Sequence, residues 1–146
     1  MNADTGVLHG RALVGGAAAG EVLVARAPLS FWGGYDYNTG EIIDRRHPLA
    51  GQIAAGRVLA LPFTIGSSTT TAVLLEAVRA GTAPAAILAG STDAFLALAA
   101  IVAGELYGKP LPVIALDAEA FAALADGQWA EVTPAGEVLL RLVPAV

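Results

Sequence analysis

Three short apolar runs alternate with two helical patterns in the middle of this chain, and this alternation restricts the fold more than any other feature of the sequence. Runs of this length with few polar residues are typical of strands buried on both faces of a parallel sheet. Such strands need helical crossovers between them, which predicts an α/β fold. The strands are expected at 57–61, 85–89 and 113–116, and the helices at 68–80 and from Ser91 or Thr92 to Tyr107.

Both helices carry signals of their faces and ends. The first has one apolar face that includes Val73 and Ala77, and Gly81 follows at the position where helices commonly stop. The second has Asp93 in its first turn, where a carboxylate complements the helix dipole. Its apolar centre, residues 94–103, predicts a helix buried in the core.

Antiparallel elements are expected at both ends of the chain. The runs 8–14 and 21–25 flank a glycine-rich turn, which predicts a hairpin. A short helix is expected at 117–124, and the runs 129–133 and 137–142 predict a closing hairpin. The hairpins can add antiparallel strands beside the parallel layer.

Composition excludes several functional classes and favours a cytoplasmic protein with one domain over residues 1–146. A net charge of −5 with a single lysine argues against nucleic acid, whose phosphates require clustered cations. No apolar run approaches the ~18 residues of a membrane span, and the first residues lack the features of a signal peptide. Without cysteine, the chain alone cannot hold an iron–sulfur cluster. Because 55% of its residues are hydrophobic, either the core is unusually complete or an apolar surface meets a partner.

Residues 30–47 form an aromatic and charged segment that differs from the apolar background. Such a segment is costly to order and rarely serves as a simple connector. Its Phe31-Trp32 pair either anchors it in the chain's own core or enters a groove of a partner. The arginines of Arg45-Arg46-His47 either bind a carboxylate or phosphate or pair with Asp44. Because Pro48 disfavours a helical backbone at the preceding residue, the imidazole of His47 is expected to be displayed from an extended backbone.

A second unusual run, Gly66-Ser67-Ser68, follows a predicted strand and opens a predicted helix. Backbone N–H groups and hydroxyls at such a point favour a phosphate, a carboxylate or a developing oxyanion. The alternative is a simple helix cap, although the threonines that follow are mediocre helix formers. The chain offers no metal-spaced His/Asp cluster and no complete Ser/His/Asp set, so the two unusual segments together predict part of an active site.

At this point the motifs become recognisable as a set. In order and spacing they resemble the small subunit of the aconitase X family, and the residues that carry the resemblance are Ser30-Phe31-Trp32-Gly33-Gly34-Tyr35-Asp36, Thr39-Gly40-Glu41-Ile42-Ile43-Asp44, His47-Pro48, Gly51 and Gly66-Ser67-Ser68. The resemblance implies a swivelling β/β/α domain, similar to the C-terminal swivelling domain of aconitases. It also implies a hydro-lyase (dehydratase) subunit that is inactive without a large subunit, whose cysteines hold an iron–sulfur cluster.

The resemblance further implies roles for particular residues. Ser67 matches the proton-abstracting base, with Ser68 as the alternative. The other residues expected to line the site or bind substrate are Gly66, Ser68, Thr69, Arg45, Arg46 and His47. The candidates for the subunit interface are Phe31, Trp32, Tyr35 and Asp36, and no residue of this chain is expected to bind a metal.

The chain departs from the family pattern near the serines. Thr64-Ile65 precede Gly66 where many relatives have an Arg-Gly or similar pair, and Thr69 stands where aconitases proper place an arginine. These differences concern the substrate more than the reaction. Within this family, the alanine-rich and lysine-poor composition looks bacterial and favours cis-3-hydroxy-L-proline or a similar small hydroxy acid as the substrate. The alternatives are mevalonate 5-phosphate, a non-catalytic anion-binding module and a purely structural subunit.

Overall fold

The computed structural model describes residues 6–66 and 68–142. Eight strands and three helices occur in this part of the chain, and the central alternation of strands and helices is confirmed. In chain order the elements are β1 (Gly6–His9), β2 (Arg11–Val14), β3 (Ala18–Val24), β4 (Val58–Leu61), α1 (Ser68–Ala80), β5 (Ala86–Ala89), α2 (Ala94–Tyr107), β6 (Val113–Ala115), α3 (Ala118–Ala122), β7 (Gln128–Val132) and β8 (Glu137–Leu142).

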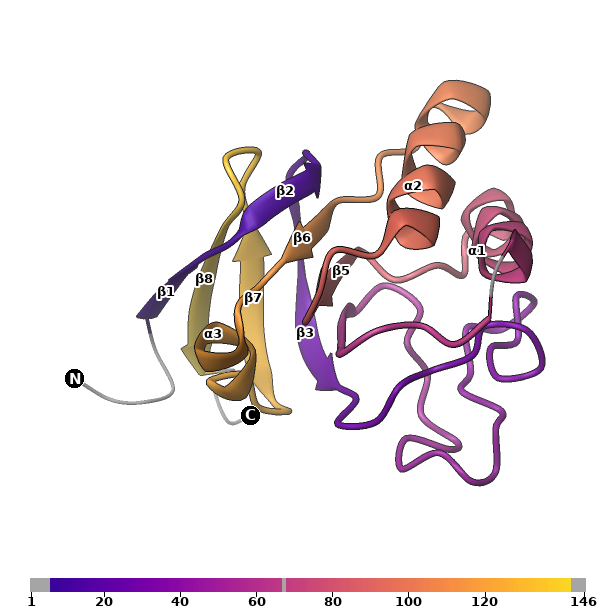
Figure 1. The fold of residues 1–146 in the computed structure, drawn as a ribbon, viewed down its shortest axis with the longest axis horizontal. Coiled ribbons are helices and arrows are strands. Elements are labelled where there is room, and N and C mark those ends of the chain that lie inside the picture. Colours follow the sequence, from indigo (N-terminus) through magenta and orange to yellow (C-terminus); the bar gives the residue numbers. More distant parts are fainter. Residues whose placement is uncertain (1–5, 67, 143–146) are drawn as a thin grey trace.

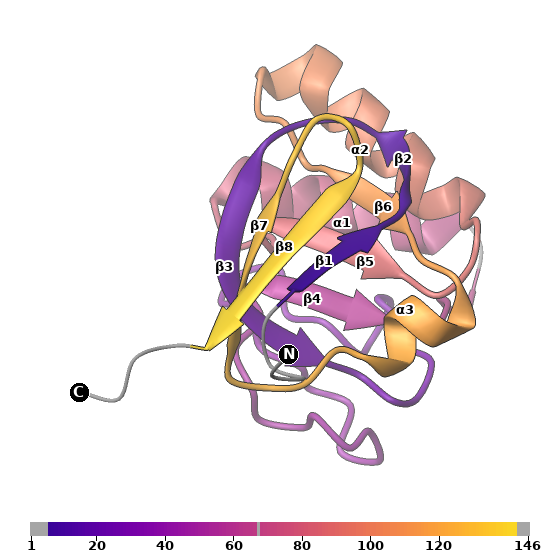
Figure 2. The same cartoon turned by 90° about the vertical axis from the view of Figure 1, so that its left-hand side faces the viewer.

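All eight strands belong to one rolled sheet in the order β1-β8-β7-β3-β4-β5-β6-β2. Strands β3 to β6 are mutually parallel, and the closing β7–β8 hairpin lies against β3 in antiparallel orientation. The two edge strands, β1 and β2, are separated only by Gly10, whose N–H donates to the carbonyl of Gly136 at 2.9 Å. The sheet therefore closes almost completely into a barrel (Figure 2).

The predicted hairpin of residues 8–14 with 21–25 is wrong. The first run is divided at Gly10 into β1, which pairs with β8, and β2, which pairs with β6. A Cβ at Gly10 would lie 2.8 Å from the carbonyl oxygen of Ala115 and would also meet the side chains of Ile114 and Leu116. Glycine is therefore needed where the chain crosses from one edge of the sheet to the other.

Two apolar clusters lie on opposite faces of the sheet. One fills the barrel interior and includes Val22, Val58, Leu88 and Ile114. The other lies between the outer face of the parallel strands and the two long helices, which pack against each other along their length. Figure 1 shows α1 and α2 on one side of the sheet, with the β7–β8 hairpin on the far side.

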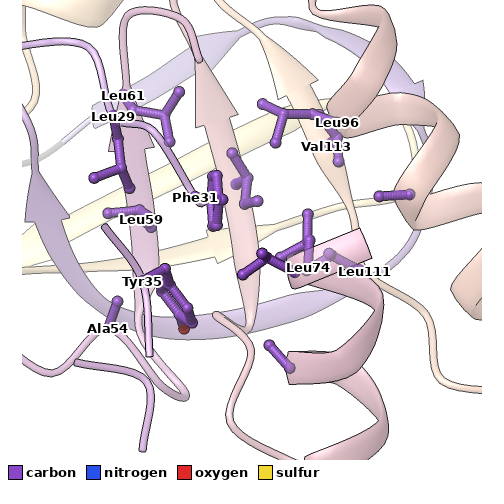
Figure 3. Close-up of a cluster of buried hydrophobic side chains, with 14 of the residues drawn as sticks. Leu29, Phe31, Tyr35, Ala54, Leu59, Leu61, Leu74, Leu96, Leu111 and Val113 are labelled. Carbon is purple, nitrogen blue, oxygen red and sulfur yellow. The ribbon is translucent and has the colours of Figure 1, made fainter. Parts of the chain in front are cut away.

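The β3–β4 loop, residues 25–57, completes the second cluster. It contains few regular hydrogen-bonded pairs, yet Phe31 and Ile42 are fully buried and Tyr35 is nearly so. In Figure 3 the Phe31 ring lies among side chains from the strands and from α1 and α2, including Leu59 and Leu74. The loop is thus a third covering element on this face of the sheet, beside the two helices.

Helix α2 differs from its prediction in two respects. Only one face is buried, while Leu98 and Ile101 expose about half of their surface, at 49% and 51%. Its N-cap is Asp93, rather than Ser91 or Thr92, because the Asp93 carboxylate accepts the first free backbone N–H groups of the helix. Within the described ranges, no helix combines the length and apolar character needed to cross a membrane.

Candidate functional site

The carboxyl ends of the parallel strands meet at one edge of the sheet, and the segment after β4 is held there between two neighbours. On one side, the N–H of Leu29 donates to the carbonyl of Phe63 at 3.3 Å, and the N–H of Ile65 donates to the carbonyl of Leu29 at 3.0 Å. On the other side, the Ser91 hydroxyl donates to the carbonyl of Pro62 at 3.2 Å. The pairing of the sheet therefore continues beyond β4, and Gly66 lies between its end and the start of α1.

Gly66 makes the turn into α1 with a φ of +104°, a conformation that side chains strongly disfavour. A Cβ there would lie 3.5 Å from the Thr69 hydroxyl. The first turn of α1 contains no acidic residue, so no carboxylate of its own offsets the positive end of the helix dipole. An anion or a developing negative charge is therefore favoured at this end of α1.

The predicted base, Ser67, lies outside the described residues, and only the backbone of Ser68 is described, as the first residue of α1. The next three residues have distinct environments. Thr69 is half-buried, and the Thr71 hydroxyl donates to the carbonyl of Phe95 at 3.4 Å. The Thr70 hydroxyl is fully buried without a hydrogen-bond partner among the described residues. Thr70 is therefore packed inside the fold, whereas Thr69 and Thr71 are partly exposed.

Asp93 is the polar residue of this edge that sequence reasoning did not connect to the site. Its carboxylate is about nine-tenths buried and accepts four hydrogen bonds. One oxygen accepts the N–H groups of Phe95 and Leu96 at 3.0 and 3.1 Å. The other accepts the N–H and the hydroxyl of Thr64 at 3.1 and 2.6 Å. The capping role could have been inferred from the sequence, but no local signal reveals the bond to Thr64, 29 residues away.

Arg45 and Arg46 are exposed at a turn of the β3–β4 loop. Their neighbour Asp44 accepts the backbone N–H of Arg46 at 3.0 Å, and the ion pairs found among the described residues do not include these arginines. No hydrogen bond between described residues joins either guanidinium to Gly66. Their role in binding substrate stays a prediction.

His47 is buried, so the expectation that its imidazole is displayed is wrong. Its Nδ1 accepts the N–H of Leu49 at 3.0 Å, and its Nε2 lies 3.2 Å from the carbonyl oxygen of Ala27. With Nδ1 as acceptor, the ring proton is on Nε2 and is donated to that carbonyl. His47 therefore ties the loop to the segment after β3 and leaves neither ring nitrogen free for a ligand.

The aromatic residues proposed for the interface separate into two groups. Phe31 and Tyr35 pack together in the chain's own core, with ring centroids 5.2 Å apart, and the Tyr35 hydroxyl donates to the carbonyl of Thr82 at 2.7 Å. These two side chains are corrected from interface residues to core residues. Burial raises the pKa of the Tyr35 hydroxyl well above its ordinary range.

Trp32 and Asp36 stay at the surface. Trp32 is 67% exposed and lines a shallow cavity of about 460 Å³ together with Asp36, Tyr37, Ile43 and the α1 residue Val73. One Asp36 oxygen accepts the N–H of Asn38 at 2.8 Å. These two residues are the ones from the predicted interface set whose positions allow contact with another chain.

A metal site is not formed by the part of the chain described here. No group of three or more His, Cys, Asp or Glu side chains comes together among residues 6–66 and 68–142, and the sequence contains no cysteine. The donor set of this chain therefore does not fit an iron–sulfur cluster.

The described part of the chain is thus a rolled α/β sheet that presents the N-terminus of α1 at the carboxyl edge of its parallel strands. The model of one family, described as the aconitase X swivel domain, matches residues 7–140. The chain therefore belongs to the aconitase X swivel domain family. This result confirms the resemblance and the swivelling-domain fold inferred from the motifs.

Named relatives and a solved structure support this assignment. The cis-3-hydroxy-L-proline dehydratase of Pseudomonas aeruginosa is 49% identical over 134 residues, which are 92% of this chain and 23% of that protein. The phosphomevalonate dehydratase small subunit of Thermococcus onnurineus is 44% identical over 97 residues, which are 66% of this chain and 75% of that subunit. The crystal structure of Thermococcus kodakaraensis aconitase X in its holo-form matches with a TM-score of 0.83 at 34% identity, over 93% of this chain and 98% of that chain. The chain thus spans less than a quarter of the length of the Pseudomonas aeruginosa relative.

Proposed function

We propose that this chain is the small-subunit half of an aconitase X-type hydro-lyase. The observation that carries the proposal is the Gly66 turn: a glycine at positive φ, at the carboxyl edge of a parallel sheet, opens a helix that has no acidic residue in its first turn. In a member of the aconitase X swivel domain family, this is the position of the Gly-Ser-Ser motif. The dehydratase names of the relatives support the reaction class.

In this proposal Ser67 removes the proton from the carbon α to the substrate carboxylate, and the hydroxyl of the adjacent carbon leaves, so that water is lost overall. A serine hydroxyl is a poor base unless its alkoxide is stabilised. The N-terminus of α1 supplies a positive potential next to residue 67, which favours the alkoxide. Ser68 and Thr69 would then line the same site.

We propose that the iron–sulfur cluster of the assembled enzyme is held by a cysteine-bearing large subunit. This division follows from chemistry, because a cluster requires thiolate ligands and this chain has none. The contribution of this chain is limited to the base, the oriented backbone of α1 and the residues around them.

The large subunit would dock over the Gly66 edge. Three large apolar side chains near the turn, Phe63, Ile65 and Phe95, are 48%, 53% and 38% exposed, and Trp32 lies a few residues beyond the Leu29 pairing. Apolar side chains exposed together favour a protein interface over solvent. The relatives support a second part to the enzyme, because this domain is 23% of one dehydratase and 75% of a protein named as a small subunit.

For the substrate we favour cis-3-hydroxy-L-proline over mevalonate 5-phosphate. The support is the relative that carries that name, which is more similar over a longer span (49% over 134 residues) than the phosphomevalonate dehydratase small subunit (44% over 97 residues). A phosphate would also be expected to require fixed cations, whereas Arg45 and Arg46 are exposed at a loop turn.

Reconstitution tests the proposal. The chain and a candidate large subunit are purified separately, and water loss from cis-3-hydroxy-L-proline and from mevalonate 5-phosphate is followed with each alone and with both together. We expect turnover of the first compound only in the mixture. Turnover of mevalonate 5-phosphate would show that the proposed substrate is wrong and would support the proposed reaction class. No turnover of either compound in a stable, cluster-loaded complex would overturn the proposal.

A further inference from the structure

Asp93 links the segment that follows β4 to the N-terminus of α2. One carboxylate oxygen caps α2, and the other accepts both the N–H and the hydroxyl of Thr64, two residues before the Gly66 turn. The 2.6 Å bond from the Thr64 hydroxyl is short, as expected for a hydrogen bond to an ionised carboxylate. The Gly66 turn is therefore anchored to the N-terminus of α2 by a buried group.

The anchor acts on the side of Thr64 that faces α2, beyond the bond from the Ser91 hydroxyl to the carbonyl of Pro62. Leu29 supports Phe63 and Ile65 from the direction of β3, through backbone bonds. On the opposite side, the Asp93 carboxylate accepts two hydrogen bonds from Thr64 itself. Without it, Thr64 would keep its strand-like neighbour but lose the contact that sets its distance from α2.

We propose that Asp93 is a positioning residue that holds Thr64, and through it the Gly66 turn, at the geometry required for proton abstraction. The proposal rests on the proposed function of Ser67. Displacement of a catalytic group by about 1 Å lowers turnover by about a hundredfold, so a tether two residues from the turn is sufficient to matter. A capping role alone would require one carboxylate oxygen, whereas Asp93 uses both.

The variants separate the tether from the cap. In Asp93→Asn the amide oxygen can still cap α2, but the NH₂ group cannot accept the Thr64 N–H. Thr64→Val removes the hydroxyl donor from the other partner, and Thr64→Ser keeps it. Asp117→Asn is the matched control, because Asp117 caps α3 by accepting the N–H of Ala120 at 2.8 Å, whereas the hydrogen bonds of Thr64 described above go to Asp93.

The assembled enzyme gives the first readout. We expect Asp93→Asn and Thr64→Val each to lower kcat by about 10- to 100-fold with KM changed by no more than about twofold. The double variant should lose little more than either single one, and Thr64→Ser and Asp117→Asn should retain the wild-type kcat. Unchanged kcat in Asp93→Asn and Thr64→Val, additive losses, or an equal loss in Asp117→Asn would overturn the proposal.

Amide hydrogen exchange in the full chain gives a second readout that does not depend on activity. In Asp93→Asn, exchange at the Thr64 N–H should accelerate by about 10- to 100-fold, the effect of losing a hydrogen bond to a charged group. Exchange at Phe95 and Leu96 should change much less. If Thr64 stays protected while Ser67→Ala abolishes turnover, the tether fails and the proposed function stands. If Thr64 is released but no dehydratase activity exists in the wild-type complex, the proposed function fails, and with it the catalytic role of the tether.

Discussion

Phe31 and Trp32 are adjacent aromatic residues with opposite environments, and the difference predicts opposite phenotypes. Phe31 is 0% exposed and its ring pairs with Tyr35, whereas Trp32 is 67% exposed. Replacing a fully buried phenylalanine by alanine removes its transfer free energy and leaves a cavity, at a cost of about 3–5 kcal/mol. Since whole domains are stable by about 5–15 kcal/mol, Phe31→Ala should lose a large part of the total. Trp32→Ala should stay within about 0.5 kcal/mol of wild type.

Urea unfolding followed by far-ultraviolet circular dichroism measures both variants, since one of them removes one of the two tryptophans and would disturb a fluorescence signal. We also expect Trp32→Ala to bind the large subunit more weakly than wild type does, because exposed tryptophans are frequent binding anchors. A loss of less than about 1 kcal/mol in Phe31→Ala would contradict the assignment of the β3–β4 loop to the core.

Two further predictions concern close packing and a buried hydroxyl. Gly10→Ala should lower the free energy of unfolding by about 1–3 kcal/mol, because the added Cβ would collide with Ala115 and the residues beside it. Gly104→Ala in α2 is the control: a Cβ there has no neighbour within 4 Å, so this variant should raise the free energy of unfolding by about 0.5–1 kcal/mol. Urea unfolding measures both variants. Burial raises the pKa of Tyr35, so the fold favours its protonated form. The stabilisation from the protonated Tyr35 hydroxyl is therefore complete below the pKa of tyrosine in the unfolded chain, which is near 10. Above that pH the free energy of unfolding should fall by up to about 1.4 kcal/mol per pH unit. Tyr35→Phe should abolish this pH dependence in unfolding curves measured between about pH 9 and 11.5.

Local sequence patterns predicted those helices and strands whose apolar periodicity and end signals lie within their own residues. Helix α1 begins and ends where its apolar face and Gly81 indicate, and the closing β7–β8 hairpin follows its alternating runs. The parallel strands were recognisable because strands buried on both faces have continuous apolar sequences. These features depend on neighbours in the chain and need no tertiary information.

The wrong predictions concern residues whose pairing or burial depends on contacts with residues distant in the sequence. Gly10 divides a β-type run because of its close approach to residues 114–116, more than 100 positions away. His47 is buried because its ring bonds to the carbonyl of Ala27, 20 residues earlier, a contact that overrides the preference for an open, extended display before proline. Phe31 and Tyr35 were expected at a subunit interface, yet the outer face of the sheet in this chain provides the groove that they fill.

The sequence predicts the backbone arrangement of the candidate site but not the side-chain contacts that surround it. The Gly66 turn follows from a strand, a glycine and a helix start in sequence. The burial of Thr70 and the bonds between Asp93 and Thr64 depend on the packing of α2 beside the turn, which no local pattern encodes.

The most direct test of the account is the turnover of Ser67→Ala in the assembled complex, compared with Ser68→Ala. The two serines are neighbours, but the proposed base is Ser67, the residue that precedes the first residue of α1. We expect Ser67→Ala to form the complex with its cluster and to lose at least about a hundredfold in kcat, the scale of a lost general base. Ser68→Ala should retain most of the activity. Full turnover by the Ser67→Ala complex would show that Ser67 is not the base.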